Sequence, residues 1–182
     1  MIDISGIQHL ADKSIYDIYD LAVNHFDNAV FVELGSYFGG STIYLASQIK
    51  QKNKDIKVYA IDIWQNFIEP GVGGSIFPFF WQNVIDYKCD QIIKPVMLDS
   101  RYTAKAFNDE SVDFVFIDAD HRYNFVYADI RNWLPKVKPG GWLGGHDYNQ
   151  EVELAVHHIF EDELGLDVEI YEDWCRSFLV RL

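Results

Sequence analysis

Short apolar runs alternate with helix-length segments along this chain, and this alternation restricts the possible folds more than any other feature. The runs are rich in Val, Ile and Phe, most end at Asp, Glu or Gly, and they cover Ala29–Leu34, Lys57–Asp62, Ile92–Leu98, Val112–Asp118 and Gly141–Gly145. Helices are expected around them at about Ile15–Phe26, Ser41–Lys50, Phe77–Tyr87, Tyr102–Phe107, Phe125–Leu134 and Glu151–Leu164. Continuous apolar strands are typical of a parallel sheet that helices cover on both faces. The pattern therefore predicts an α/β fold with right-handed βαβ crossovers.

The end of the chain follows a different pattern. Asp167–Tyr171 and Cys175–Arg181 have the composition of strands, and only Glu172–Trp174 separates them. A connection this short cannot contain a crossover helix, so the two segments should pair as an antiparallel hairpin. The expected sheet is therefore mostly parallel and ends in a C-terminal antiparallel hairpin.

Length and charge restrict the organisation and the partners. The chain has 182 residues, which matches one domain, so a single domain over residues 1–182 is expected. Lys and Arg number 15 against 28 Asp and Glu, a net charge of −13, which argues against binding to nucleic acid or to an anionic membrane surface. Charged residues in the first twenty positions argue against a signal peptide, so we expect a cytoplasmic protein. The sequence leaves the oligomeric state open, and a homo-oligomer is one state that it allows.

The first motif, Glu33-Leu-Gly-Ser-Tyr-Phe-Gly-Gly-Ser41, lies where a strand turns into a helix. A dinucleotide site would have G-x-G-x-x-G here, and Gly35 and Gly40 occupy the first and third glycine positions. Tyr37 occupies the second, where a glycine lets pyrophosphate approach the backbone, so a dinucleotide is disfavoured. Glu33 would repel phosphate and favours a cationic or zwitterionic ligand. The alternative is a tight turn that binds nothing.

The second motif, Val58-Tyr-Ala-Ile-Asp-Ile-Trp64, ends the next strand at Asp62. A carboxylate at this position of a doubly wound sheet can accept hydrogen bonds from both ribose hydroxyls of an adenosine. Trp64 is close enough in sequence to stack on the base. The alternative is that Asp62 only caps a turn, which the presence of the first motif makes less favoured.

Two further motifs place polar side chains after strands. Asp118, Asp120 and His121 follow one apolar run, and His146 and Asp147 follow the next. Open α/β sheets bind ligands at the carboxyl ends of their strands. Carboxylates are hard oxygen ligands for Mg²⁺, and histidine adds a softer ligand or a base. The alternative is that these are loop charges that cap the following helix, and Asp120 fits that description best.

Together, the four motifs resemble the class I S-adenosylmethionine-dependent methyltransferases. Within that class the chain is similar to the small catechol and caffeoyl-CoA O-methyltransferases, and to bacterial methyltransferase-domain proteins related to cephalosporin hydroxylase and macrolide sugar O-methyltransferases. The resemblance covers about residues 5–181. It implies a Rossmann-like, doubly wound, seven-stranded sheet in the order 3-2-1-4-5-7-6. It also implies methyl transfer from S-adenosylmethionine to a hydroxyl of a small-molecule acceptor.

The resemblance also assigns parts of the cofactor to the motifs. The methionine part would lie in the glycine turn, the ribose at Asp62, and the adenine beside Leu98-Asp-Ser100, with Ser100 or Asp99 touching the base amine. The full predicted set of cofactor-binding residues is Glu33, Gly35, Tyr37, Gly39, Ser41, Asp62, Trp64, Asp99, Ser100 and Asp118.

A metal and a base are implied as well. Strands four and five are neighbours in the family sheet, so Asp118 and Asp147 would meet as a carboxylate pair beside His146. The plant and animal enzymes have Asp-Asn where this chain has Asp147-Tyr148, so His146 is expected to be the third ligand of a divalent cation, with Mg²⁺ preferred. Their lysine base corresponds to His121, which with Asp118 forms the predicted catalytic pair. The alternatives are that His121 itself binds the metal, or that it acts without one.

Some predictions and alternatives remain. The aromatic, glycine-rich segment Gln65–Phe80 is predicted to be a lid over the ligand, and the alternative is a surface loop before a buried amphipathic helix. A non-catalytic S-adenosylmethionine-binding module would not need Asp118, His121 and Asp147. An NAD-linked oxidoreductase or epimerase is disfavoured by the residue at the second glycine position, and a hydroxylase would need a facial triad of iron ligands that the sequence does not clearly supply.

Overall fold

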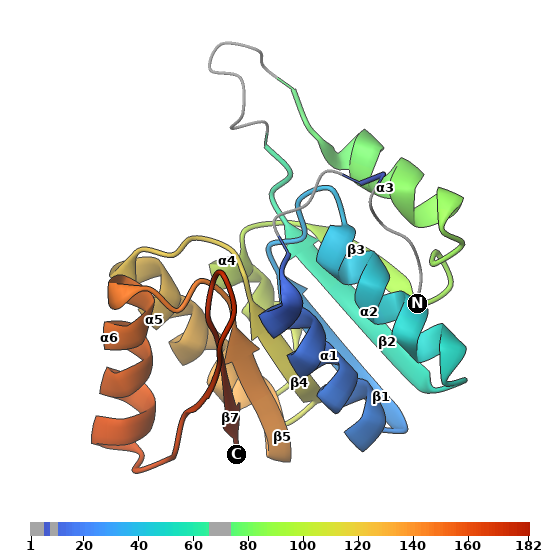
Figure 1. The fold of residues 1–182 in the computed structure, drawn as a ribbon. Helices are drawn as coiled ribbons and strands as arrows, with labels where there is room; N and C mark the ends of the chain where they lie inside the picture. The colour runs from blue at the N-terminus through green and yellow to red at the C-terminus, as the bar shows by residue number, and fades with distance from the viewer. Residues whose placement is uncertain (1–5, 8–10, 66–73) are drawn as a thin grey trace.

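The computed structural model describes residues 6–7, 11–65 and 74–182 (Figure 1). In these residues seven strands form one sheet in the order β3-β2-β1-β4-β5-β7-β6. The strands are β1 (Asn28–Leu34), β2 (Asp55–Asp62), β3 (Ile93–Met97), β4 (Val112–Ile117), β5 (Val137–Gly145), β6 (Glu169–Tyr171) and β7 (Ser177–Arg181). β1 to β5 are parallel, and β7 runs antiparallel to both β5 and β6. The predicted strand order and the C-terminal hairpin are confirmed.

The helices match the predicted segments with small shifts. They are α1 (Lys13–His25), α2 (Gly40–Gln51), α3 (Phe77–Asp86), α4 (Ser100–Thr103), α5 (Tyr123–Trp133) and α6 (Gln150–Val156). Short 3₁₀ turns, η1 (Ala104–Ala106) and η2 (Leu134–Lys136), follow α4 and α5, and α6 continues as a π-helix, η3 (His157–Glu163). The predicted helix at 102–107 is therefore α4 followed by η1, because the Asp99 side chain accepts from the Arg101 N–H and starts the helix earlier.

Helices bury both faces of the sheet. Phe114 and Phe116 of β4 pack in one apolar cluster with α1, α2 and α3, whereas Val115 and Ile117 pack in the other with α5 and α6. Successive strand side chains point to opposite faces, so a strand covered on both sides must be apolar throughout. Figure 1 shows α5 and α6 side by side on one flank of the sheet.

The parallel strands end together at one edge of the sheet. The register pairs Ile117 of β4 with Gly145 of β5, so Asp118 and His146 follow neighbouring strand ends. The His146 N–H donates to the Ile117 carbonyl at 3.0 Å, and the Asp118 N–H donates to the Leu34 carbonyl at 2.7 Å. These bonds bring the loops after β1, β4 and β5 together. None of the described helices is both long enough and apolar enough to cross a membrane.

Candidate functional site

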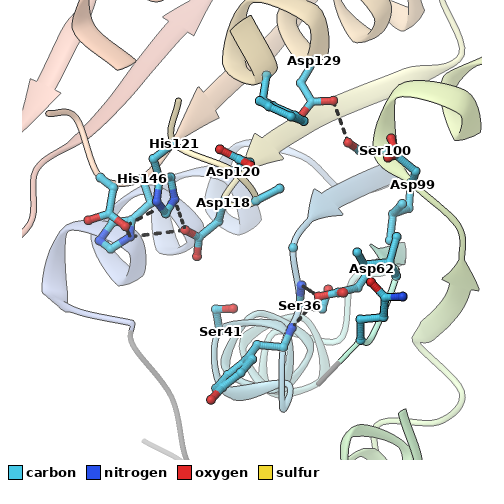
Figure 2. Close-up of a pocket in the computed structure, with 18 of the residues that line it drawn as sticks. Ser36, Ser41, Asp62, Asp99, Ser100, Asp118, Asp120, His121, Asp129 and His146 are labelled. Carbon is cyan, nitrogen blue, oxygen red and sulfur yellow. Dashed lines mark hydrogen bonds and ion pairs between the residues drawn. The ribbon is translucent and has the colours of Figure 1, made fainter. Parts of the chain in front are cut away.

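A cavity of about 750 Å³ opens at this carboxyl edge of the sheet (Figure 2). Most of the predicted site residues line it: Gly35, Tyr37, Ser41, Asp62, Asp99, Ser100, Asp118, His121, His146 and Asp147. Three predicted cofactor residues, Glu33, Gly39 and Trp64, do not line it. The structure therefore gathers the motifs at one cavity and moves three residues out of direct contact with a ligand.

The turn between β1 and α2 needs glycine for packing. Gly35 has a φ of 86°, and a Cβ there would lie 2.0 Å from the Asp118 carbonyl oxygen. Gly39 has a φ of 90°, and a Cβ there would lie 3.1 Å from the Phe80 ring. Both positions thus favour glycine because of backbone conformation and neighbouring atoms of the protein. The prediction that Gly39 contacts the cofactor is not supported, because it faces Phe80.

Glu33 lies behind the cavity wall. Its side chain is fully buried, and its carboxylate accepts hydrogen bonds from the hydroxyls of Tyr19, Ser36, Ser41 and Thr42. Burial raises the pKa of Glu33, and the hydroxyl donors offset part of that rise. Glu33 was expected to face a cationic ligand, and the structure corrects this. It instead holds Ser36 and Ser41, which do line the cavity.

Asp62 holds the glycine turn through its backbone. One carboxylate oxygen accepts from the N–H groups of Ser36 and Tyr37, both at 2.9 Å, and the other accepts from the Trp64 N–H at 2.6 Å. Asp62 therefore caps the turn, as the alternative interpretation of the second motif expected. Its side chain also lines the cavity. A carboxylate has about four acceptor positions, so roughly one remains for a ribose hydroxyl. The turn amides that a pyrophosphate would need are already bonded, which strengthens the case against a dinucleotide.

The prediction that Trp64 stacks on the adenine base is wrong. Its side chain is 0% exposed and packs against Phe77 and Phe80, with ring centroids 5.0 and 4.6 Å away. Its indole N–H donates to the Tyr37 carbonyl at 2.9 Å. The backbone of Trp64 itself has a φ of 44°. In this conformation the Trp64 side chain lies in the core, so it cannot stack on a base in the cavity.

The segment predicted to lie beside the adenine is held by its own contacts. Both carboxylate oxygens of Asp99 accept hydrogen bonds from Arg101, at 2.8 Å from Nε and 2.5 Å from a terminal nitrogen. The Ser100 hydroxyl donates at 2.7 Å to Asp129, a residue of α5 that also lines the cavity. Figure 2 shows this pair on the side of the cavity away from the histidines.

Four ionisable side chains meet at the other end of the cavity. His121 Nε2 lies 3.5 Å from an Asp118 oxygen and 3.3 Å from an Asp147 oxygen. His146 Nδ1 lies 3.4 and 3.5 Å from the same two oxygens. The ligand atoms of the alternative set, Asp118, His121 and Asp147, all lie within 4.8 Å of one another. His146 also forms a group with Asp12 and Cys175, but its Nδ1 still faces the two carboxylates of the predicted set. Figure 2 shows His121 and His146 beside Asp118.

The donor set fits a divalent cation. Ligands of an octahedral ion at about 2.1 Å lie about 3 Å from one another, so these nitrogen–oxygen pairs need to move only slightly. The His121 Nε2 is buried and has no hydrogen-bond partner among the described residues, which leaves its lone pair or proton directed at the carboxylates. Two carboxylates and an imidazole match Mg²⁺, Mn²⁺ or a similar ion.

The two carboxylates at this end of the cavity shift the pKa values of the neighbouring histidines. Burial lowers the pKa of His121, but Asp118 and Asp147 outweigh it and raise the pKa above its ordinary value. Burial also lowers the pKa of His146, but the same two carboxylates together outweigh it and raise this pKa to about 10. Burial alone would raise the pKa of Asp118, but the two histidines lower it. Without a cation, protons on the imidazoles balance the carboxylate charge.

Asp12 supports this end from outside the predicted motifs. It is the N-cap of α1, where it accepts from Ser14, and it also accepts from the Cys175 N–H at 2.8 Å. Its carboxylate lies 3.5 Å from His146 Nε2, on the far side of the ring from Asp118. His146 Nε2 makes no hydrogen bond with the described residues, but the charge of a carboxylate at this distance favours a ring orientation and tautomer with an N–H toward it. Asp12 gives no signal of this role in the sequence, because Cys175 and His146 are more than 130 residues away in the chain.

Asp120 follows the alternative interpretation. It accepts from the N–H of Arg122 at 3.0 Å and forms an ion pair with its guanidinium, at the start of α5. Residues 66–73, half of the predicted lid Gln65–Phe80, lie outside the described residues. In its described ends, Gln65 pairs with Ser75 in an antiparallel bridge, and Ser75 Oγ donates to the Trp64 carbonyl.

With this geometry established, comparisons with known proteins decide the family. A model of the methyltransferase domain family matches residues 32–148, which include the glycine turn, Asp62 and the loops after β4 and β5. The chain belongs to this methyltransferase family. The resemblance to class I S-adenosylmethionine-dependent methyltransferases, and the cofactor that it implies, are thereby confirmed.

Curated relatives are similar over part of their length. The rhamnosyl O-methyltransferase of Mycobacterium tuberculosis (strain H37Rv) is 25% identical over 141 residues, which are 75% of this chain and 54% of the relative. The uncharacterized protein y4gI of Sinorhizobium fredii is 27% identical over 118 residues, 64% of this chain and 13% of that protein. The chain thus spans about half, or less, of the length of these relatives.

Solved structures share the fold. The S-adenosylmethionine-dependent O-methyltransferase of Thermotoga maritima aligns over 98% of this chain and 68% of its own, with a TM-score of 0.71 and 14% identity. The Streptococcus mutans protein SMU.1697c, solved in complex with SAH, aligns over 94% of this chain and 99% of its own, with a TM-score of 0.69 and 13% identity.

Proposed function

We propose that this methyltransferase transfers a methyl group from S-adenosylmethionine to a hydroxyl of a small-molecule acceptor, with the help of a divalent cation. One observation carries the proposal: Asp118, Asp147 and two histidines meet in the cavity that the glycine turn also lines. Binding of the cofactor alone would not require this cluster. The family's cofactor and an acid–base cluster therefore share one cavity of about 750 Å³.

The cofactor would lie along the wall that the glycine turn forms. Ser36 and Ser41 present hydroxyls fixed by Glu33, and Gly35 lets the turn approach the loop after β4. Asp62 keeps the turn in shape and has acceptor capacity left for the ribose. Fixed polar groups of this kind orient a bound molecule at little entropic cost, and orientation is a main source of rate in a displacement reaction.

The cation would be held by Asp118 and Asp147 with His146 or His121 as the nitrogen ligand. When bound, such an ion polarises an acceptor oxygen and favours its deprotonated form. His146 is buried and backed by Asp12, which suits a ligand of fixed orientation. His121 is more exposed than His146, lines the cavity and can exchange protons with an acceptor. The preferred roles are therefore His146 as ligand and His121 as general base, with Asp118 touching both.

The names of the relatives support a choice of acceptor to test first. The mycobacterial relatives are named as rhamnosyl O-methyltransferases, so a sugar hydroxyl is the first acceptor to test. No described helix can cross a membrane, and the charge of −13 disfavours nucleic acid. A small-molecule acceptor in the cytoplasm is the proposal consistent with these observations.

Calorimetric titration with S-adenosylhomocysteine, NAD⁺ and divalent cations tests the binding half of the proposal. Binding of S-adenosylhomocysteine without binding of NAD⁺ is expected. Micromolar binding of NAD⁺ alone would favour the oxidoreductase alternative. Transfer of a labelled methyl group to a panel of glycosides and phenols, in the presence of Mg²⁺ and in chelator, tests catalysis. Cofactor binding without transfer to any member of a broad panel would favour the non-catalytic module.

A further inference from the structure

Asp129 is an acidic residue on the buried face of α5. It is 2% exposed, and its neighbours on that face are Val126, Ile130 and Trp133, all of which are buried. A carboxylate within an apolar stripe costs free energy unless other groups satisfy it. Asp129 nevertheless also lines the cofactor cavity, where its neighbour is Ser100 (Figure 2).

The hydrogen bonds of Asp129 are incomplete. One oxygen accepts from Ser100 Oγ at 2.7 Å, and the other accepts no hydrogen bond from the described residues. The guanidinium of Arg101, whose charge acts on Asp129, binds both oxygens of Asp99 instead. Burial raises the pKa of Asp129 to about 6, with the charge of Asp99 adding to the rise and that of Arg101 opposing it. The protein thus keeps a poorly compensated acid at a wall of the cavity.

Other groups at this wall are already committed. Both oxygens of Asp99 accept from Arg101, and the Ser100 hydroxyl hydrogen is directed at Asp129. The Ser100 carbonyl accepts from the Trp133 indole N–H at 3.1 Å. Of the two carboxylates at this wall, Asp129 is the one with an oxygen that accepts no hydrogen bond from the described residues.

We propose that Asp129 accepts a hydrogen bond from the exocyclic amine of the cofactor's adenine and selects adenine against 6-oxopurines. The inference rests on the proposed binding of S-adenosylmethionine in this cavity. An amine at position 6 donates to a carboxylate oxygen, whereas a 6-oxo group would bring two acceptors together. Ser100 would act as a positioning residue that holds the carboxylate by its other oxygen.

Titration calorimetry with S-adenosylhomocysteine and with its 6-oxo analogue, S-inosylhomocysteine, tests the proposal. The unmodified protein should bind the adenine compound about tenfold or more tightly, since a hydrogen bond to a charged group is lost and a repulsion is gained. In Asp129→Asn the preference should fall to a few-fold or less, because an amide that keeps its oxygen for Ser100 presents NH₂ donors to the base, and these suit a 6-oxo group better than an amine. Asp120→Asn is the matched control: it removes another cavity-lining acid, one paired with Arg122, and should keep the preference.

The outcomes separate this proposal from the one on which it rests. If the unmodified protein binds both compounds equally, Asp129 does not select the base, and this result needs no variant to fold. If Asp129→Asn binds S-adenosylhomocysteine and keeps the full preference, the proposal is overturned while cofactor binding stands. If the unmodified protein binds neither compound, both proposals fail. If Asp129→Asn loses the preference for the adenine compound while Asp120→Asn keeps it, the assignment of Asp129 to the adenine amine is supported.

Discussion

Replacing Asp129 by Asn should stabilise the cofactor-free protein above about pH 6 and have little effect near pH 4. The carboxylate is buried, has one hydrogen bond and is not paired with a cation. Its pKa is raised from 3.8 to about 6, chiefly by burial. The amide has a similar shape, keeps an oxygen for the Ser100 hydroxyl and carries no charge. The substitution therefore removes the cost of the ion and little else.

The sign and size follow from the two pKa values. The folded state binds the Asp129 proton more tightly than the unfolded state, so the contribution of Asp129 to the unfolding free energy falls as pH rises from 3.8 to about 6, then stays level. That difference corresponds to roughly 3 kcal/mol at about 1.4 kcal/mol per pH unit. Water in the cavity screens the charge, so the expected gain in Asp129→Asn is about 1–3 kcal/mol at pH 8.

Urea unfolding of both proteins at several pH values between about 4 and 8 measures this difference. Asp120→Asn is the control. Arg122 lowers the pKa of Asp120, so removing the Asp120 charge should not stabilise the protein. A gain in Asp129→Asn that is the same at every pH would refute the electrostatic reasoning, and so would no gain at pH 8. If Asp129→Asn is more stable and also binds adenine less selectively, Asp129 is a residue that lowers stability in order to serve binding.

Three further predictions concern the rest of the cavity. Asp62→Ala should weaken S-adenosylhomocysteine binding about tenfold or more in calorimetry, because two turn amides and any ribose contact lose their acceptor; unchanged affinity would place the cofactor elsewhere. His121→Ala should reduce turnover of an identified acceptor by a general-base factor of about 10²–10⁴ and leave S-adenosylhomocysteine affinity intact; loss of cation binding as well would make His121 the nitrogen ligand. Chelator should abolish transfer and Mg²⁺ or Mn²⁺ should restore it, whereas full activity in chelator would remove the cation from the mechanism.

The architecture could be predicted from the sequence because its signals are local. Apolar runs such as Val112–Asp118 are continuous, which is what burial on both faces of a parallel sheet demands. The short link Glu172–Trp174 leaves the last two strands no choice but an antiparallel pair. Parallel strands end at one edge, so polar residues that follow such runs are predicted at that edge. The pairing of Asp118 with Asp147 is what the resemblance implies, because it makes their two strands neighbours, as β4 and β5 are.

The roles of individual side chains depended on tertiary contacts. Asp62 and the two turn amides that it accepts from are 26 and 25 residues apart, and only the packing of β1 beside β2 brings them within 2.9 Å. Glu33 and Trp64 are polar or aromatic residues next to a ligand motif, yet the local backbone directs both into the core. Sequence spacing predicts which residues are close to a site, but side-chain direction within it is decided by φ, ψ and the neighbours that fill the space.

Asp12 and Asp129 are residues whose places at the site could not be predicted from the sequence. Asp12 reads as an ordinary helix cap, and Asp129 as one polar residue in an amphipathic helix. Each gains a place at the site because a strand end or a loop far away in the chain packs against it: the end of β5 at Asp12, and Ser100 at Asp129. The sequence by itself determined the sheet, its edge and the carboxylates on it. The tertiary structure decided which acids face the ligand, because burial and hydrogen bonding are properties of the packed chain.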